Sequence, residues 1–239
     1  MKSNLCAFIG SGDLAARCAL QLNDLDLNLL GVCRNPDILP LIFRGVMADY
    51  TTPGALDFLS EKAPDYLITT FKPLQRDLAG YEKGFVKAAQ NVVDGLGDHS
   101  PDLVIFVSST RVFSEKEGHW ITESSARTKI DPLGQAIIEA EQVLRRANLK
   151  LVTLYCSGLY GGTSNDYLMN RLKNRDFSPD KDDRFTNRIH RQDIAGFLAW
   201  LIRLKLCEKP IAESYIVSDS SPSTRSEVED WLAQQLKIT

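Results

Sequence analysis

The stretch that decides the fold is Leu5-Cys6-Ala7-Phe8-Ile9-Gly10-Ser11-Gly12-Asp13-Leu14-Ala15, close to the start of the chain. Its first five residues are apolar and predict a buried strand, and the residues after the glycines predict a helix over Asp13–Leu22. In a strand–turn–helix unit of this kind, Gly10 permits a tight turn and Gly12 lets the backbone approach a diphosphate. Ala15 is small enough for the helix to pack closely on the strand.

The turn therefore predicts a dinucleotide site that includes Gly10, Ser11, Gly12, Asp13 and Leu14. The free N–H groups and the partial positive charge of the helix N-terminus would bind the phosphates. Asp13 is an unusual residue beside phosphates, so it either caps the helix or turns away from the ligand. The alternative interpretation is a glycine turn that binds nothing, but the strand and helix on either side argue against it.

Apolar strands and amphipathic helices alternate along the next part of the chain. We expect strands at Leu27–Cys33, Val46–Ala48, Tyr66–Thr70, Leu103–Val107 and Leu151–Tyr155, and helices at Pro53–Lys62, Tyr81–Leu96 and Pro132–Ala147. This alternation predicts an α/β fold, a doubly wound parallel sheet of the Rossmann type with helices on both faces. Ligands of such folds bind at the carboxyl ends of the strands, where the motifs of this chain also fall.

The character of the sequence changes after residue 156. Ser157–Arg191 is rich in Gly, Asn, Asp and Arg and predicts a loop-dominated region, followed by a helix at Gln192–Leu206, a strand at Tyr215–Val217 and a helix at Arg225–Leu236. We expect a dinucleotide-binding core over residues 1–156 and a small substrate-side region over 157–239, packed together as a single structural unit. The basic residues of that region either bind a phosphate or carboxylate or form a solvated loop; they include Arg171, Lys173, Arg175, Arg184 and Arg188.

Composition narrows the choice of partners. The net charge of −3 gives no electrostatic reason to expect nucleic acid or an acidic membrane. No apolar run approaches the ~20 residues that span a bilayer, so a cytoplasmic protein is expected. The five cysteines show no CxxC pairing, and the three histidines lack metal-ligand spacing, so no metal site is expected.

The end of the second strand distinguishes the two nicotinamide dinucleotides. An acidic residue there would bind the ribose 2′-hydroxyl of NAD(H), but this chain has Cys33-Arg34-Asn35. Arg34 could pair with a 2′-phosphate, so NADP(H) is favoured over NAD(H); the alternative is a solvated surface arginine. Asp49, after the third strand, is a candidate acceptor for the adenine amino group or a plain loop-capping residue.

Four segments together resemble the extended and atypical short-chain dehydrogenase/reductases, the NAD-dependent epimerase/dehydratase group. They are the Gly10–Ala15 turn, Val107–Phe113, Ser157–Gly162 and Asn187–Ala195, and the last segment is most similar to the YeeZ-type subgroup. The resemblance covers essentially the whole chain. It implies that Ser109 is catalytic and that Thr69, Ser108, Ser157 and Gly158 contact the cofactor.

The family also needs a tyrosine and, four residues on, a lysine. In the register set by Pro132 and Gly134, these positions are occupied by Leu133 and Ile137, which can neither shuttle a proton nor tune a phenol. Another acid–base would be needed, and Tyr155, Tyr160 and His190 are candidates.

Each candidate for proton transfer has a structural alternative. Tyr160 could pack in a loop, and His190, directly before a helix, could act as a structural hydrogen-bonding group. Arg111 could stabilise an oxyanion or pair with an acid such as Glu123. We assign catalysis to Ser109, His190 and Tyr160.

Three functions follow from these features. The first is an epimerase/dehydratase-like oxidoreductase acting on a small polar substrate, for which a nucleotide sugar is one candidate. The second is a non-catalytic NADP(H)-binding sensor or regulatory protein, and the third a scaffold that binds no ligand. The helices at Tyr81–Leu96 and Pro132–Ala147 form the dimer interface in many relatives. Their charged outer faces are compatible here with a wet interface or with plain solvent, so a homodimer is one candidate assembly.

Overall fold

The computed structural model describes residues 3–115, 117–162, 167–174 and 185–237. A parallel sheet of seven strands forms its centre, in the order β10-β6-β5-β4-β1-β2-β3. These strands are β1 (Asn4–Ile9), β2 (Leu27–Cys33), β3 (Phe43–Met47), β4 (Tyr66–Thr69), β5 (Leu103–Ser109), β6 (Leu151–Cys156) and β10 (Ser214–Val217). The order confirms the predicted doubly wound Rossmann fold, and it brings the ends of β1, β4, β5 and β6 side by side.

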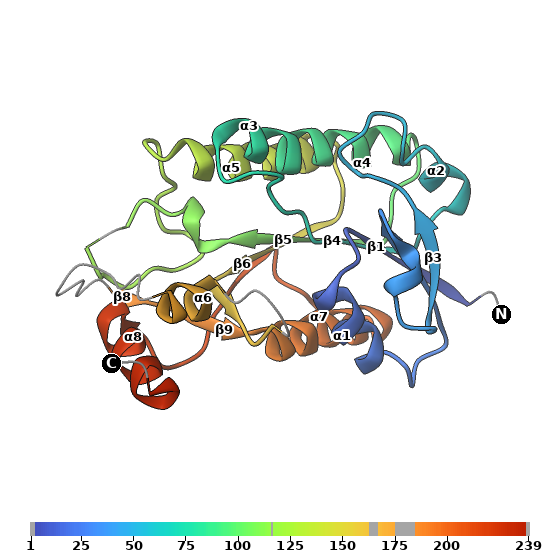
Figure 1. Ribbon diagram of the computed structural model, residues 1–239. Helices are drawn as coiled ribbons and strands as arrows, with labels where there is room; N and C mark the ends of the chain where they lie inside the picture. Colours follow the sequence, from blue (N-terminus) through green and yellow to red (C-terminus); the bar gives the residue numbers. More distant parts are fainter. Residues whose placement is uncertain (1–2, 116, 163–166, 175–184, 238–239) are drawn as a thin grey trace.

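Helices cover both faces of the sheet, as Figure 1 shows. On one face lie α1 (Asp13–Gln21) and α7 (Arg191–Leu206); the other carries α2 (Phe58–Lys62), α3 (Leu78–Tyr81), the π-helical turn η2 (Glu82–Lys87), α4 (Ala88–Leu96) and α5 (Pro132–Arg146). Short 3-10 turns, η1 (Pro36–Ile38) and η3 (Thr110–Val112), follow β2 and β5. Each face has its own apolar core, so every central strand is buried on both sides.

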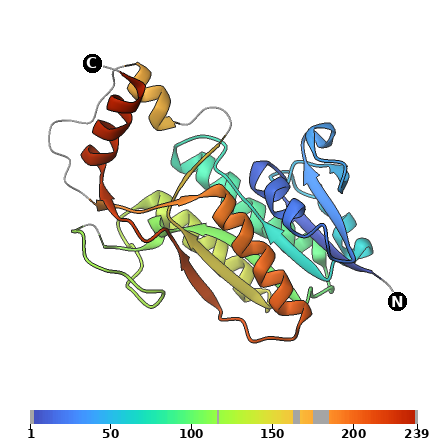
Figure 2. The same cartoon turned by 90° about the horizontal axis from the view of Figure 1, so that it is seen from below.

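The region after β6 is more regular than the predicted loop. β7 (Gly158–Tyr160) pairs in parallel with β9 (Arg188–His190), and β8 (Phe185–Thr186) pairs with β11 (Ser223–Thr224). Helices α6 (Tyr167–Lys173) and α8 (Arg225–Leu236) lie against each other at one end of the molecule (Figure 2).

Such two- and three-residue strands are too short to give a period in the sequence, which is why the prediction missed them. Of the predicted basic residues, Arg175 and Arg184 lie outside the described residues. No helix in the described part of the chain is long and apolar enough to span a membrane.

A buried polar network joins β6 to α5. The Tyr155 side chain is 1% exposed, and its hydroxyl donates to the Glu141 carboxylate at 3.0 Å. Arg127 donates to the same hydroxyl and lies over the Tyr155 ring, 4.1 Å from the ring centroid. Burial raises the pKa of Tyr155, and the neighbouring Glu141 carboxylate adds to the effect. Tyr155 as a candidate proton donor is therefore wrong, because its hydroxyl is enclosed in the core.

We expect Tyr155→Phe to lower the free energy of unfolding by about 1–3 kcal/mol, because Arg127 and Glu141 lose a buried hydrogen-bonding partner. Urea unfolding followed by circular dichroism measures the change. Dinucleotide affinity should not change, since the Tyr155 hydroxyl is enclosed in the core on the α5 face of the sheet, while the glycine turn leads into α1 on the opposite face. A loss of affinity without a loss of stability would contradict this assignment.

Candidate functional site

The turn after β1 is held in place by its neighbours. The Gly10 and Ser11 amides both donate to the Val32 carbonyl of β2, at 3.0 and 2.9 Å. Gly10 has a φ of +88°, and a Cβ atom there would lie 2.8 Å from the Thr70 carbonyl oxygen. No other residue type fits this position without strain. The Ser11 hydroxyl donates inward to the Phe8 carbonyl at 2.8 Å, so Ser11 can offer a ligand its backbone but not its hydroxyl proton.

Helix α1 begins directly after this turn with its N-terminus uncapped. Gly12 is the N-cap residue, and no side chain bonds to the first helical amides. A Cβ atom at Gly12 would meet only the Gly10 carbonyl oxygen, at 3.9 Å, so the space above Gly12 is open. Ala15 is fully buried against the sheet, as the sequence predicted, and Leu14 packs beside it. The turn has the free amides and the open approach that a diphosphate requires.

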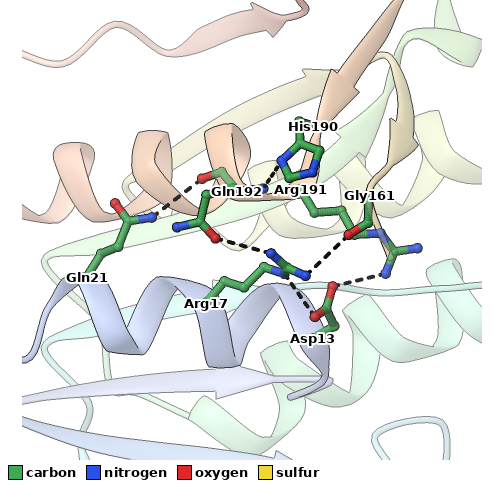
Figure 3. A network of polar contacts seen from close by, with 7 residues as sticks. All are labelled: Asp13, Arg17, Gln21, Gly161, His190, Arg191 and Gln192. Carbon is green, nitrogen blue, oxygen red and sulfur yellow. Dashed lines mark hydrogen bonds and ion pairs between the residues drawn. The ribbon is translucent and has the colours of Figure 1, made fainter. Parts of the chain in front are cut away.

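Asp13 does not cap the helix. Its carboxylate turns away from the first turn and pairs with Arg17, at 2.9 Å, and with Arg191 of α7, at 3.2 Å (Figure 3). Arg17 also donates to the Gly161 carbonyl and to the Gln192 side chain. The capping alternative for Asp13 is therefore wrong, and its turning away from a ligand stays a prediction. Two guanidinium groups outweigh its charge, which leaves the region near the helix N-terminus positive.

Two threonines at the end of β4 have different surroundings. Thr69 is completely buried, and its hydroxyl donates to the Ile105 carbonyl at 3.3 Å. The Thr69 side chain is thus enclosed in the core, and binding of the cofactor by Thr69 stays a prediction. Thr70 instead reaches the glycine turn and donates to the Gly10 carbonyl at 2.8 Å. In a strand whose residues are all buried, the sequence does not show which of two adjacent threonines points inward.

Two serines at the ends of β5 and β6 have buried hydroxyls without a partner among the described residues. Ser108 is 6% exposed and Ser157 is 5% exposed. Buried polar atoms in folded proteins are rarely left without a hydrogen bond, and a bound ligand is one common reason for an exception. Gly158, next to Ser157, is exposed. The predicted cofactor positions Ser108, Ser157 and Gly158 thus lie at the carboxyl edge of the sheet.

A charged cluster follows β2 and β3. The Asp49 carboxylate accepts from the Thr51 amide and hydroxyl, at 2.9 and 2.7 Å, which agrees with the loop-capping alternative. Desolvation acts to raise the pKa of Asp49, but the bonds from Thr51 and the positive charges of Arg34 and Lys83 lower it overall. Lys83, on the π-helical turn η2, was not predicted, and nothing in its local sequence marks it. Two exposed cations and one anion therefore meet here.

A cavity of about 1110 Å³ opens at the ends of β5, β6 and β10. Ser109 lines it, as do Ser157 and Gly158. Its charged lining includes Glu115, Arg111, Arg188, Asp219 and Arg225, and its aromatic lining includes Tyr81 and Trp120. The Arg188 side chain is partly buried and makes no hydrogen bond or ion pair with the described residues, and its burial lowers its pKa. An unpaired arginine in a cavity is suited to an anionic ligand.

Arg111 pairs with an acid, but not with the predicted Glu123. Its Nε and Nη2 atoms donate to the two Asp131 oxygens at 2.6 and 3.0 Å, and Glu123 accepts from the Ile216 amide instead. The hydrogen bond from Arg111 lowers the pKa of Asp131. This bidentate pair fixes Arg111 at the cavity wall beside Ser109, whose hydroxyl accepts from the Arg111 amide.

Tyr160 and His190 lie beside each other, and neither is among the described residues that line the cavity. Their ring centroids are 5.1 Å apart, edge to face. His190 caps α7, where its Nδ1 atom accepts from the Gln192 amide at 3.2 Å. The structure thus brings Ser109 to the cavity and gives His190 the structural role that the sequence left open. Catalysis by Tyr160 or His190 stays a prediction.

Leu133 and Ile137 lie one turn apart near the start of α5, and Ile137 is buried in the core. Neither side chain can transfer a proton. Their match to the family's tyrosine and lysine positions stays a prediction. The described residues contain no group of His, Cys, Asp and Glu side chains that could hold a metal ion.

Solved structures similar to this one share the fold over its whole length. A Methylobacillus flagellatus protein, provisionally named an NAD-dependent epimerase/dehydratase, has 27% identity and a TM-score of 0.80, and covers 100% of this chain and 84% of its own. UDP-glucuronic acid 4-epimerase from Bacillus cereus, in complex with NAD, has 14% identity, a TM-score of 0.80 and coverage of 99% and 85%. The Bordetella bronchiseptica enzyme WbmG, with NAD and UDP, has 15% identity, a TM-score of 0.78 and coverage of 99% and 79%.

These likenesses confirm the resemblance to the NAD-dependent epimerase/dehydratase group, while the YeeZ-type subgroup stays a prediction. No protein-family model and no curated protein matches the sequence.

The Arg111–Asp131 pair makes a pH-dependent contribution to stability. Because the pKa of Asp131 is lowered in the folded state, the pair stabilises the fold above the ordinary aspartate pKa of about 3.9, and this contribution is lost as the pH falls through the lowered value. Asp131→Asn keeps one capping oxygen at the start of α5, but removes the charge and one of the two oxygens that accept from Arg111. Urea unfolding should show the variant less stable at pH 7, with the difference shrinking below about pH 4. A difference independent of pH would contradict this account.

Proposed function

We propose that this protein binds a nicotinamide dinucleotide, NADP(H) in preference to NAD(H), and is an epimerase/dehydratase-like oxidoreductase. The observation that carries the proposal is the Gly10–Gly12 turn, with its uncapped helix and the open space above Gly12. The bound cofactor would accept or return a hydride at its nicotinamide ring. The buried hydroxyls of Ser108 and Ser157 would gain hydrogen-bonding partners when the site is filled.

The preference for NADP(H) rests on this chain's own residues, since two of the similar structures were determined with NAD. Arg34 and Lys83 both act on Asp49, so positive charge predominates at the end of β2. No carboxylate occupies the position where an NAD-specific enzyme binds the ribose hydroxyl. An arginine there is suited to a 2′-phosphate, because its planar fork can donate two hydrogen bonds to one phosphate.

For the substrate we propose a small polar molecule with an anionic group, and a nucleotide sugar is the candidate. The support is the large cavity at the ends of β5 and β6, where Arg188 has no partner among the described residues. Two similar structures were determined with such ligands: one with UDP-glucuronic acid, which is a nucleotide sugar, and one with UDP, the nucleotide part of such a sugar. Ser109 would donate its hydroxyl proton to a substrate oxygen, while the bidentate bond to Asp131 keeps Arg111 beside it.

The proton donor would be Tyr160 or His190, which lie side by side at the ends of the paired strands β7 and β9. His190 Nδ1 accepts the Gln192 amide, so the neutral ring would carry its proton on Nε2. That atom is the one available to exchange a proton with Tyr160 or a ligand.

A non-catalytic NADP(H) sensor is the second candidate. The apolar side chains of Leu133 and Ile137 near the start of α5 favour it, because they leave the start of this helix without an acid or base at either position. Such a protein would bind the dinucleotide as tightly as an enzyme does but would not turn over a substrate.

The two candidates are distinguished by incubating the protein with NADP⁺ or NAD⁺ and a panel of UDP-sugars, followed by proton NMR of the anomeric signals. An enzyme should interconvert or dehydrate at least one sugar, and Ser109→Ala should slow that reaction about a hundredfold or more. Dinucleotide binding without any turnover would support the sensor.

Arg34 should determine the choice of dinucleotide. We expect Arg34→Gln to weaken NADPH binding about tenfold or more while NADH binding stays within twofold, because only NADPH has the phosphate. Nucleotide fluorescence gives both dissociation constants. Arg44→Gln, at an exposed arginine of the neighbouring strand β3, is the matched control and should change neither.

Two results would contradict the assignment of Arg34. One is a wild-type protein that binds NADH more tightly than NADPH. The other is an equal loss of both nucleotides in Arg34→Gln.

A further inference from the structure

The pairing of Asp13 with Arg191 connects two distant parts of the chain. Arg191 is the first residue of α7, and it reaches the N-terminal end of α1 next to the glycine turn. We infer that Arg191 binds the diphosphate of the dinucleotide, and that Asp13 is the positioning residue that presents it. This inference rests on the proposed dinucleotide binding and extends it to a residue from the substrate-side half.

The Arg191 guanidinium has donors left for a ligand. Its Nη1 atom bonds to Asp13 at 3.2 Å, and its Nη2 atom has no partner in the described part of the chain. The Nε atom is buried and also unpaired there. In Figure 3 the guanidinium lies beyond the N-terminal end of α1, on the side of Asp13 away from Arg17. With a side chain 35% exposed, it is covered on one side and open on the other.

Arg17 differs from Arg191 in this respect, although it binds the same carboxylate. Its three donor nitrogens are used by Asp13, by the Gly161 carbonyl at 3.3 Å and by the Gln192 side chain at 3.2 Å. These bonds attach α1 to the residues after β7 and to the start of α7. Arg17 therefore holds the two halves together, and Arg191 is the arginine of the pair that can also contact a ligand.

The backbone around Arg191 fixes its orientation. Gly161 has a φ of +84°, and a Cβ atom there would overlap the His190 ring, 2.0 Å from its Nε2 atom. At Gly162 a Cβ atom would lie 3.2 Å from the Arg191 Cζ atom. Gly162 thus lets the chain pass close to the guanidinium, and Gly161 lets it pass over the ring of the preceding His190. An arginine fixed before the ligand arrives loses little conformational entropy on binding.

Charge also favours a diphosphate at this point. A lone carboxylate beside the first turn of α1 would repel phosphates, but the Asp13–Arg17–Arg191 group carries a net charge of +1. That charge adds to the partial positive charge of the helix N-terminus. This account explains the unusual Asp13 beside the glycine turn, because its carboxylate holds the Arg191 guanidinium of α7 at the place where the phosphates would bind.

The test compares ligands with and without a diphosphate on Arg191→Gln. We expect the dissociation constants of NADPH and ADP-ribose to rise about ten- to hundredfold, because a charged hydrogen-bonding partner of the phosphates is lost. Adenosine, measured by competition with NADPH, should bind within twofold of wild type. Arg203→Gln is the matched control: Arg203 also lies on α7 and pairs with Asp24 just after α1, at 3.1 Å, but far from the turn. Its dissociation constants should stay within twofold for all three ligands.

Equal binding of ADP-ribose by wild type and Arg191→Gln would overturn the inference, as would an equal loss of adenosine. Should Arg191→Gln fail to fold, Arg191→Lys replaces it, since lysine keeps the charge and loses the planar fork. An intermediate weakening of ADP-ribose binding is then expected, and an unchanged value overturns the inference. A wild-type protein that binds neither NADPH nor NADH would overturn the proposed function itself, which distinguishes the two failures.

Discussion

The contact of Gly10 with Thr70 and the carbonyl of Val32 is the constraint on which the rest of the site depends. Both amides of the turn donate to that carbonyl, and a side chain at Gly10 would collide with the Thr70 backbone. The chain therefore turns tightly between Ile9 and Asp13, and α1 begins at the carboxyl edge of the sheet. This places the uncapped helix end, the β4 end and the β5 end next to one another.

The second half of the molecule completes this edge. The Asp13–Arg17 group ties α1 to the start of α7 and to Gly161, while Arg203 and Asp24 tie the other ends of the same two elements. The two halves are thus held together at both ends of the α1–α7 pair. A ligand at the glycine turn would contact both halves at once, and the cavity at the ends of β5, β6 and β10 lies at the same carboxyl edge of the sheet.

Buried apolar runs predicted the strands well, because a parallel sheet covered on both faces requires them. β2 and α8 have the predicted bounds, and β1, β4, β5 and β6 differ by one or two residues. The helix expected at Pro53–Lys62 forms only over Phe58–Lys62, and the strand expected at Val46–Ala48 lies at Phe43–Met47. Both lie at or near the edge of the sheet, where the apolar pattern is weakest.

The glycine turn could be predicted from local spacing and Ser109 from the family resemblance, but contacts between distant residues could not be predicted. Arg111 binds Asp131 and not the expected Glu123, and Arg191 reaches Asp13 across 178 positions of sequence. No pattern in one sequence relates such pairs, because the fold alone brings them together. The different surroundings of Thr69 and Thr70 could not be predicted either, because in a strand buried on both faces alternation does not indicate which side chain points outward.

Hydrogen–deuterium exchange with and without NADPH tests the central claim most directly. A dinucleotide at the turn should slow exchange at the amides of Gly12–Ala15, and a ligand that also binds Arg191 should slow exchange at the start of α7. Slowed exchange in both segments, together with slowed exchange near Ser157, is the result that this account predicts. Exchange at Gly12–Ala15 that is unchanged at saturating NADPH and NADH would contradict it.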